Sequence, residues 1–409
     1  MNHIKYKNIF SISESYFDQL ILFIIFFLFI VSTILPVDGN ALNYAVHIFI
    51  FPILIIYLLM IKQIQTKQYH IVLILSFITL LFIAFYPPIQ TSTLYFRFFI
   101  LKIILLSLFM SSTKLNIQNF SYILNLSYLI YLTLSMLVWF KLMPGYDYDH
   151  VNSFMINIGS FNIETLYGIS GSTADIDVYS GLIFLWNIFI YKGKYKYVLI
   201  FISFTALLLT FRNTPIIALI LSTIVYFFIR NKVFALLSLV GLIVGFSSVI
   251  WLLYFIPDNQ VPLLSGNKTW YEFFWRATHA RSSLWVQQFM IYLNNYTWYD
   301  YIVGPDLRNM TVSFIRPDGH ELHETFNPHN SYFIAFYRSS ISAIIFLLLF
   351  LTYAMKTFNR QTFPLLFFIA TSAMTNSSLF GLENPTYILI ILFIFTQNIF
   401  PNHHNKGFK

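Results

Sequence analysis

Arg212 lies in a short interruption between two strongly apolar stretches, where a guanidinium group is suited to bind phosphate. The segment 209–215 predicts that one helix ends and another begins there, with Thr214 as the N-cap and Pro215 as the first helical residue. Free backbone N–H groups of the new helix, together with the arginine, form an anion-binding site. The alternative is a simple hairpin turn whose arginine extends to a membrane surface.

A second arginine, Arg281, opens a run in which aromatic and apolar residues recur at helical spacing. The predicted helix covers about 269–293 and is expected to lie along a membrane surface, with its aromatic side chains at headgroup level. Arg281 stands one turn before Trp285, on or beside the apolar stripe. It is either a phosphate ligand or a cation stacked on Trp285 at the interface. Trp285 in turn is either an interfacial anchor or a surface on which a sugar ring stacks.

His329 stands at the start of a long apolar stretch, directly after Pro328. The positive end of a helix dipole favours the neutral imidazole, and a neutral imidazole is able to accept a proton from a hydroxyl as a general base. Asn330 and Ser331 follow at once and are predicted to cap the new helix; Asn330 and Tyr332 are also candidates to bind substrate. A lone histidine is a weak signal, so its role depends on what surrounds it.

Asp175 and Asp177 follow Gly171-Ser172-Thr173, a pattern typical of a helix start with an acidic residue in its first turn. A structural role there is the main interpretation. The alternative is that Asp175 binds sugar hydroxyls.

Arg97 lies near the outer end of a predicted membrane span and is a candidate to add to the phosphate site, whereas Lys102 lies near the middle of that span. The two are about 140° apart around a helix, so they do not share a face. The stretch from His320 to Glu324 resembles a metal site, but its two histidines are one residue too close for the His-Glu-x-x-His motif. Cysteine is absent, so we expect no thiolate metal site and no disulfide. We expect no metal and no cofactor.

The elements that must position these residues are membrane helices. Of the 409 residues 58% are apolar and 10% are charged, with a mean hydropathy of +0.70, whereas a soluble domain has about 25% charged residues. Several nearly uncharged stretches are long enough to cross a hydrocarbon layer about 30 Å thick. The predicted fold is an all-α polytopic membrane protein with about twelve spans at 17–36, 43–61, 69–86, 94–111, 120–142, 171–191, 196–211, 213–229, 233–255, 329–355, 362–379 and 384–400.

The distribution of basic residues predicts the orientation of these spans. With the N-terminus inside, the inner segments hold fourteen of the 24 basic residues, and the short outer loops at 37–42, 87–93 and 380–383 hold none. Both termini are therefore predicted to be cytoplasmic, and the first span is predicted to be an uncleaved anchor. These inner loops explain the net charge of +8, so no nucleic-acid partner is expected. The inner basic residues are Lys5, Lys7, Lys62, Lys67, Lys114, Lys192, Lys194, Lys196, Arg230, Lys232, Lys356, Arg360, Lys406 and Lys409.

The polar residues gather in two outer segments. Residues 1–255 hold nine spans and an acidic outer loop at 143–170, residues 256–328 form one large periplasmic loop, and 329–409 hold three spans and a cytoplasmic tail. Function is expected where the chain concentrates its polar residues, in and around the large loop.

Taken in order, Thr210-x-Arg212, Arg281-x-x-x-Trp285, Gly304 and His329-Asn330-Ser331-Tyr332 resemble the O-antigen ligase and polymerase superfamily, over about residues 165–355. The resemblance implies a GT-C-like, inverting, metal-independent membrane glycosyltransferase. It also implies that Arg212 and Arg281 bind the donor pyrophosphate and that His329 activates or positions the acceptor hydroxyl. The sequence departs from the family in having Phe211 where a serine is expected, and Arg338-Ser339-Ser340 where members often have glycine.

The leading expectation is an O-antigen polymerase of the Wzy type, which joins undecaprenyl-pyrophosphate-linked repeat units into O-antigen or capsule at the outer face of the bacterial inner membrane. An O-antigen ligase, which transfers polymer to lipid A-core, shares the same motifs. A transporter or flippase of lipid-linked sugars is less favoured, because the polar residues gather in an outer loop rather than at the membrane midplane. Expected partners are the lipid-linked donor and acceptor, membrane lipids, a chain-length regulator and a flippase.

Overall fold

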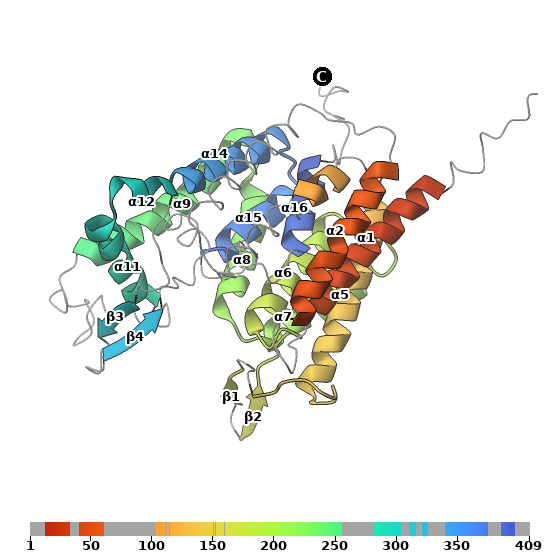
Figure 1. The fold of residues 1–409 in the computed structure, drawn as a ribbon, viewed down its shortest axis with the longest axis horizontal. Helices are drawn as coiled ribbons and strands as arrows, with labels where there is room; N and C mark the ends of the chain where they lie inside the picture. The colour runs from red at the N-terminus through yellow and green to blue at the C-terminus, as the bar shows by residue number, and fades with distance from the viewer. Residues whose placement is uncertain are drawn as a thin grey trace, which may run out of the picture.

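The protein is mostly helical in its computed structural model (Figure 1). The expected all-α class holds for the bundle, although both segments predicted as large outer loops contain a β-hairpin that the sequence analysis did not predict. The structure describes residues 13–32, 41–60, 104–110, 113, 115–149, 151, 153–158, 160–255, 281–303, 311–315, 321–325, 340–374 and 386–396.

The helices of the bundle coincide with predicted apolar stretches. They are α1 (Ser13–Ser32), α2 (Ala41–Met60), α5 (Ile117–Trp139), α6 (Thr173–Phe189), α7 (Lys196–Leu209), α8 (Asn213–Phe228), α9 (Lys232–Phe255), α14 (Ser340–Lys356), α15 (Phe363–Ser372) and α16 (Thr386–Thr396). Helix α15 is shorter than its predicted span, because it ends at Ser372 with Ala373 as its C-cap. The predicted span at 69–86 and the first part of 94–111 lie outside the described residues.

Length and apolar composition qualify one helix of the described part, α5, to cross a membrane; several shorter apolar helices accompany it. That single helix is weak evidence, because the core helix of a soluble protein passes the same test. The number of about twelve spans is therefore not supported by helix length and stays a prediction.

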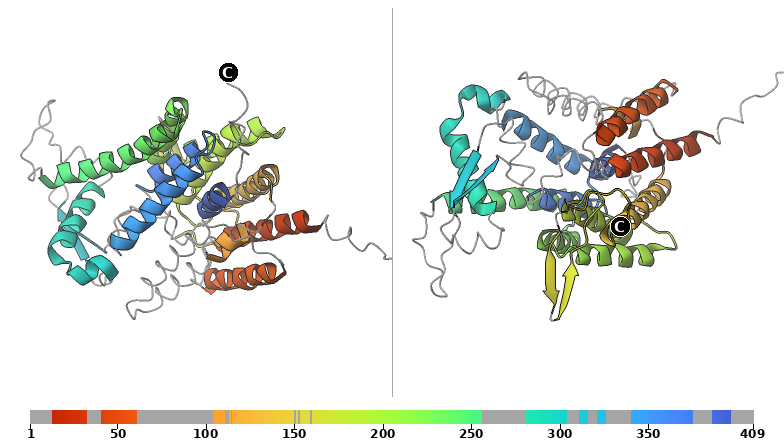
Figure 2. Two further views of the ribbon diagram at one scale, coloured as in Figure 1. Left: turned by 90° about the horizontal axis from the view of Figure 1, so that it is seen from above. Right: turned by 60° about the horizontal axis from the view of Figure 1, so that its bottom comes forward.

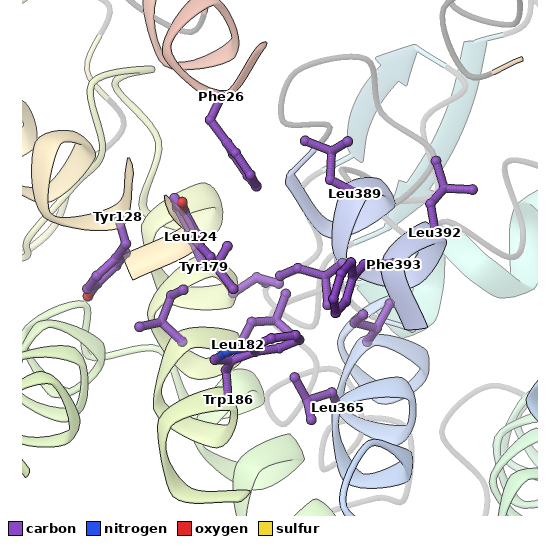
Figure 3. Packing of buried hydrophobic residues seen from close by; sticks show 14 of the residues in the cluster. Phe26, Leu124, Tyr128, Tyr179, Leu182, Trp186, Leu365, Leu389, Leu392 and Phe393 are labelled. Carbon is purple, nitrogen blue, oxygen red and sulfur yellow. The ribbon is translucent and has the colours of Figure 1, made fainter. Parts of the chain in front are cut away.

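The core is centred on α6, which packs against α5, α7, α8 and α15. Aromatic side chains from distant parts of the chain meet there, among them Trp186 of α6 and Phe393 of α16 (Figure 3). The ring of Phe120 on α5 stacks on that of Phe393 with centroids 3.8 Å apart and lies 5.3 Å from the ring of Trp186. Gly181 allows close approach of α15, since a Cβ atom there would lie 2.3 Å from the ring of Phe368. The close fit of these helices depends on residue size at each contact.

Two buried polar contacts cross the same α5–α6 interface. Asn125 and Asn187 exchange side-chain amide hydrogen bonds of 2.8 and 3.1 Å, and the Trp186 indole N–H donates to the Ser121 hydroxyl at 2.9 Å. A buried amide pair satisfied in both directions determines which residues face each other, because any slip leaves polar groups without partners.

The four short strands form two antiparallel hairpins. Strands β1 (Met155–Ile158) and β2 (Phe161–Glu164) pair with Met155 opposite Glu164, and this hairpin projects from one end of the bundle (Figure 1). Strands β3 (Thr311–Ile315) and β4 (Glu321–Thr325) pair with Thr311 opposite Thr325.

The second hairpin lies beside α11 (Arg281–Asn295) and α12 (Trp298–Val303), on the side of the molecule away from α1 and α5 (Figure 2). Helix α11 packs against β3 and α9, and α12 packs against α14. The predicted helix at 269–293 is thus confirmed from Arg281 onward, and its first part lies outside the described residues.

Candidate functional site

The turn between α7 and α8 places Arg212 at one end of the bundle. Phe211 adopts a left-handed conformation with φ of 50°, which is uncommon for a residue with a side chain and reverses the chain in one step. Arg212 is then the N-cap residue of α8 in extended conformation, and Asn213 is the first helical residue. The prediction of Thr214 as N-cap and Pro215 as first helical residue was wrong by two positions, because the left-handed Phe211 lets the helix start earlier.

Arg212 forms an ion pair with Asp177 of α6. Its Nε lies 3.3 Å from Asp177 Oδ2, and the exposed fractions of the two side chains are 20% and 2%. Helices α6, α7 and α8 follow one another through short turns, so α6 and α8 both begin at this end of the bundle. This pairing brings together two residues that the sequence analysis treated separately: a phosphate ligand and the second acid of a helix start.

Asp175, one of the predicted site residues, does lie in the first turn of α6, which begins at Thr173, two residues after the predicted start of the span at 171. Its carboxylate accepts a hydrogen bond of 2.6 Å from the Ser170 hydroxyl, and the residue is buried. The main interpretation, a structural role at the helix start, is thereby confirmed. Binding of sugar hydroxyls by Asp175 stays a prediction.

The segment before α6 braces this end of the bundle. The backbone N–H of Leu166 donates to the carbonyl of Leu209 at 2.8 Å, which ties the segment to the end of α7. Gly168 fits closely beside Tyr131, whose hydroxyl oxygen lies 2.1 Å from the position of an added Cβ. Gly171 has a φ of 72°, a conformation that glycine adopts without steric cost. These contacts hold the start of α6 against the turn that carries Arg212.

Two tyrosines outside the predicted spans support the same segment. The hydroxyl of Tyr146 donates to the carbonyl of Ile169 at 3.0 Å, and burial raises the pKa of Tyr146 well above its usual value. The hydroxyl of Tyr167 donates to the carbonyl of Val138 at 3.4 Å, and burial, reinforced by Glu164, raises its pKa to about 12. Both phenols therefore stay protonated and act as donors at any working pH.

A second group of predicted residues lies on α11, which begins at Arg281. Trp285 is 2% exposed, so its ring is packed inside the protein in this structure rather than open to a ligand. Gln288 is 0% exposed, and among the described residues its side-chain amide has no hydrogen-bond partner. The hydroxyl of Tyr292 forms a hydrogen bond of 2.8 Å with that of Ser340 at the start of α14. Positions 281, 285, 288 and 292 follow one stripe of the helix.

The sequence analysis missed Asp177 and Gln288 as members of these two groups. The spacing of Gln288 from Trp285 could have placed Gln288 in the α11 group, because residues three apart share a helix face. Local sequence gave no comparable signal for the Asp177–Arg212 pair.

The other predicted site residues cannot be compared in position. Arg97, His329, Asn330 and Tyr332 lie outside the described residues, and for Arg281 the structure describes the backbone and not the side chain. Their roles stay predictions. The stretch from His320 to Glu324 overlaps β4, and among the described residues no group of three histidine or acidic side chains is placed to bind a metal ion.

Basic residues gather at the end of the bundle opposite Arg212. The turn after α6 carries Lys192 and Lys194, the turn after α8 carries Arg230, and the turn before α15 carries Arg360. The guanidinium of Arg360 lies 4.9 Å from the centroid of the Tyr226 ring at the end of α8, so these turns lie together. The two ends of the bundle therefore differ: one is basic, and the other carries buried acids beside Arg212, with Lys141 just after the end of α5.

The Arg212 site is suited to hold an anion. The N-cap side chain forms no capping hydrogen bond with the first turn of α8, and the positive end of the helix dipole adds to the charge of the guanidinium. Comparison of the chain with protein-family models, with curated proteins and with solved structures finds no match.

Proposed function

We propose that the chain is a membrane glycosyltransferase that polymerises undecaprenyl-pyrophosphate-linked oligosaccharide repeat units into O-antigen or capsular polysaccharide. In this proposal it spans the bacterial inner membrane about twelve times, with both termini in the cytoplasm and the Arg212 end of the bundle facing the periplasm. The observation that carries the proposal is Arg212 itself, a cation held on a buried carboxylate at the acidic end of an otherwise apolar bundle.

The outward faces of α7 and α8 support the membrane part of the proposal. Large apolar side chains repeat there at helical spacing and are exposed, whereas a soluble protein would bury such a stripe. Helix α5 has 23 residues and is apolar enough to cross a membrane, and its length is roughly 35 Å at about 1.5 Å per residue. The exposed residues are Val198, Phe201, Phe204 and Leu208 on α7, and Ile217, Ile220, Leu221, Ile224, Phe227 and Phe228 on α8.

The orientation follows from the two ends of the bundle. The basic turns after α6 and α8 belong on the cytoplasmic side by the positive-inside rule. Arg212 is then at the outer face, where lipid-linked glycans are presented after they cross the membrane.

The reaction needs a cation at the leaving group and a base at the acceptor. An acceptor hydroxyl attacks the anomeric carbon from the face opposite the pyrophosphate, and the bond between that carbon and the pyrophosphate oxygen breaks. The electron pair stays on undecaprenyl pyrophosphate, where Arg212, together with Arg281 and Arg97, stabilises the developing charge. The hydroxyl proton passes to His329, and the configuration at the anomeric carbon is inverted. Asn330, Tyr332 and Asp175 are proposed to bind the sugars.

Deletion of the gene in its own host tests the proposal. A polymerase mutant retains one repeat unit on lipid A-core, or loses polymeric capsule, because single units are still made and transferred. Accumulation of full-length polymer on the lipid carrier would instead identify a ligase. Loss of all outer-face glycan, with single lipid-linked units held on the cytoplasmic face, would identify a flippase and overturn the proposal.

A further inference from the structure

We propose that Asp177 is a positioning residue whose ion pair with Arg212 holds the guanidinium in place to bind the diphosphate of the lipid-linked donor. This role rests on the proposed function, because it requires a diphosphate at Arg212. Asp177 itself does not touch the substrate.

Burial makes Asp177 an effective anchor. Its side chain is 2% exposed, and a carboxylate removed from water is stable only beside a compensating charge. Arg212 supplies that charge from a different helix. In turn, the carboxylate restricts a long side chain that would otherwise sample many rotamers at a helix start.

The contact leaves part of Arg212 open to a ligand. The guanidinium is planar and carries five N–H donors, more than one carboxylate can occupy. Its Nε lies 3.3 Å from Asp177 Oδ2, and the side chain is 20% exposed, which gives an anion access to the guanidinium.

The neighbouring acid has a different task. Asp175 accepts a hydrogen bond from Ser170 and so belongs to the start of α6. The two acids are two residues apart on a helix, which directs them about 200° apart around its axis. Asp177, by contrast, forms the ion pair with Arg212.

Loss of the carboxylate should therefore weaken donor binding without removing the ligand arginine. We expect Asp177→Asn to raise the Kd for undecaprenyl pyrophosphate about tenfold to hundredfold, in line with the cost of misplacing a binding group by about 1 Å. Asp177→Glu keeps the charge but moves it by one methylene group, so it should recover part of the affinity. If Asp177→Asn does not fold, the glutamate variant still tests the role, because its Kd should rise less than tenfold but measurably.

The experiment measures binding of undecaprenyl pyrophosphate to the purified full-length protein in lipid nanodiscs, with thermal stability recorded on the same samples. Asp18→Asn is the matched control. Asp18 is a buried acid on α1, far from Arg212 in the sequence, and its carboxylate accepts a hydrogen bond from the Tyr57 hydroxyl. The control should lose stability without any change in Kd. An Asp177→Asn protein with lowered stability and the wild-type Kd would show a purely structural role and overturn the inference.

A double variant separates this role from a direct contact with the ligand. In an Arg212→Gln background, Asp177→Asn should cause no further rise in Kd, because the residue acts through Arg212. An equal rise in both backgrounds would contradict the inference while leaving the proposed function intact. If the wild-type protein binds no undecaprenyl pyrophosphate, the proposed function fails, and the role of Asp177 fails with it.

Discussion

Arg212 and Asp177 depend on each other in a way that changes how variants at this site must be interpreted. Because Asp177 is almost fully buried, removal of Arg212 takes away a positive charge that compensates its carboxylate. Loss of activity in a simple alanine variant would then mix a folding defect with the loss of a phosphate ligand. A variant that changes both Arg212 and Asp177 separates the folding defect from the loss of the phosphate ligand.

Arg212→Ala should lower the free energy of unfolding by about 3 kcal/mol, as expected for breaking a buried ion pair. Arg212→Ala with Asp177→Asn should recover most of that loss, because the remaining side chain is neutral, yet should form no polymer. Thermal unfolding in detergent and a gel of the glycan chain lengths measure the two effects. Wild-type chain lengths in the double variant would rule out Arg212 as the phosphate ligand.

His329 is the residue we expect to serve the acceptor hydroxyl. His329→Ala should reduce turnover with a purified lipid-linked donor by about 10²- to 10⁴-fold, the usual contribution of a general base. Donor binding should persist, because the arginines remain. Substitutions of His320 or His323 are the controls and should reduce turnover far less. Loss of donor binding as complete as in the arginine variants would show that His329 acts on the donor and not on the acceptor.

Gln288 is a buried amide whose polar atoms have no partner among the described residues. Gln288→Leu should therefore raise the free energy of unfolding by about 1–2 kcal/mol, because the cost of burying unsatisfied polar groups disappears while the volume is nearly kept. Thermal unfolding measures the change. A loss of stability would show that the amide has a partner in the folded protein.

At the level of secondary-structure elements, close packing around α6 is the main determinant of how the helices are arranged. Helix α6 packs against α5, α7, α8 and α15, and its start carries both acids of the site. Small residues allow these contacts, and Gly181 is the clearest example because its Cα faces the ring of Phe368 on α15. A substitution that forces α6 and α15 apart should therefore lower the stability of the folded protein.

Gly181→Ala should lower the free energy of unfolding by about 1–3 kcal/mol, because a methyl group there overlaps a buried aromatic ring. Gly241→Ala on α9 is the matched control: in the described part of the chain, no atom beyond its own helical turn lies within 4 Å of its added Cβ, so the gain in helix propensity should leave stability unchanged or raised by about 0.5–1 kcal/mol. Equal effects of the two variants in thermal unfolding would contradict the packing of α6 on α15.

At the scale of the whole molecule, the two ends of the bundle differ in charge, and this difference predicts topology. Reporter fusions after positions 64, 193 and 360 should give cytoplasmic signals, and fusions after positions 150 and 300 should give periplasmic signals. Paired reporters, one active only in each compartment, provide the control at every position. A cytoplasmic signal at position 300 would place the large loop on the wrong side for a lipid-linked donor presented at the outer face.

The sequence by itself determined where the helices lie and which ends of them are basic. Apolar runs and the turns between them are local properties, so the starts of α6 and α7 and the break between α7 and α8 were predictable within a few residues. Asp175 at the start of α6 followed from the same local pattern. The chain also showed which residue types are able to bind a diphosphate.

Only the tertiary structure decided which of these residues meet. The pairing of Asp177 with Arg212 depends on how α6 packs against α8, and no local pattern encodes a contact between residues so far apart in the chain. The left-handed Phe211 moved the start of α8, and the burial of Trp285 and Gln288 follows from the packing of α11 against β3 and α9. These features arise from close packing, which selects among the many arrangements that the same apolar helices allow.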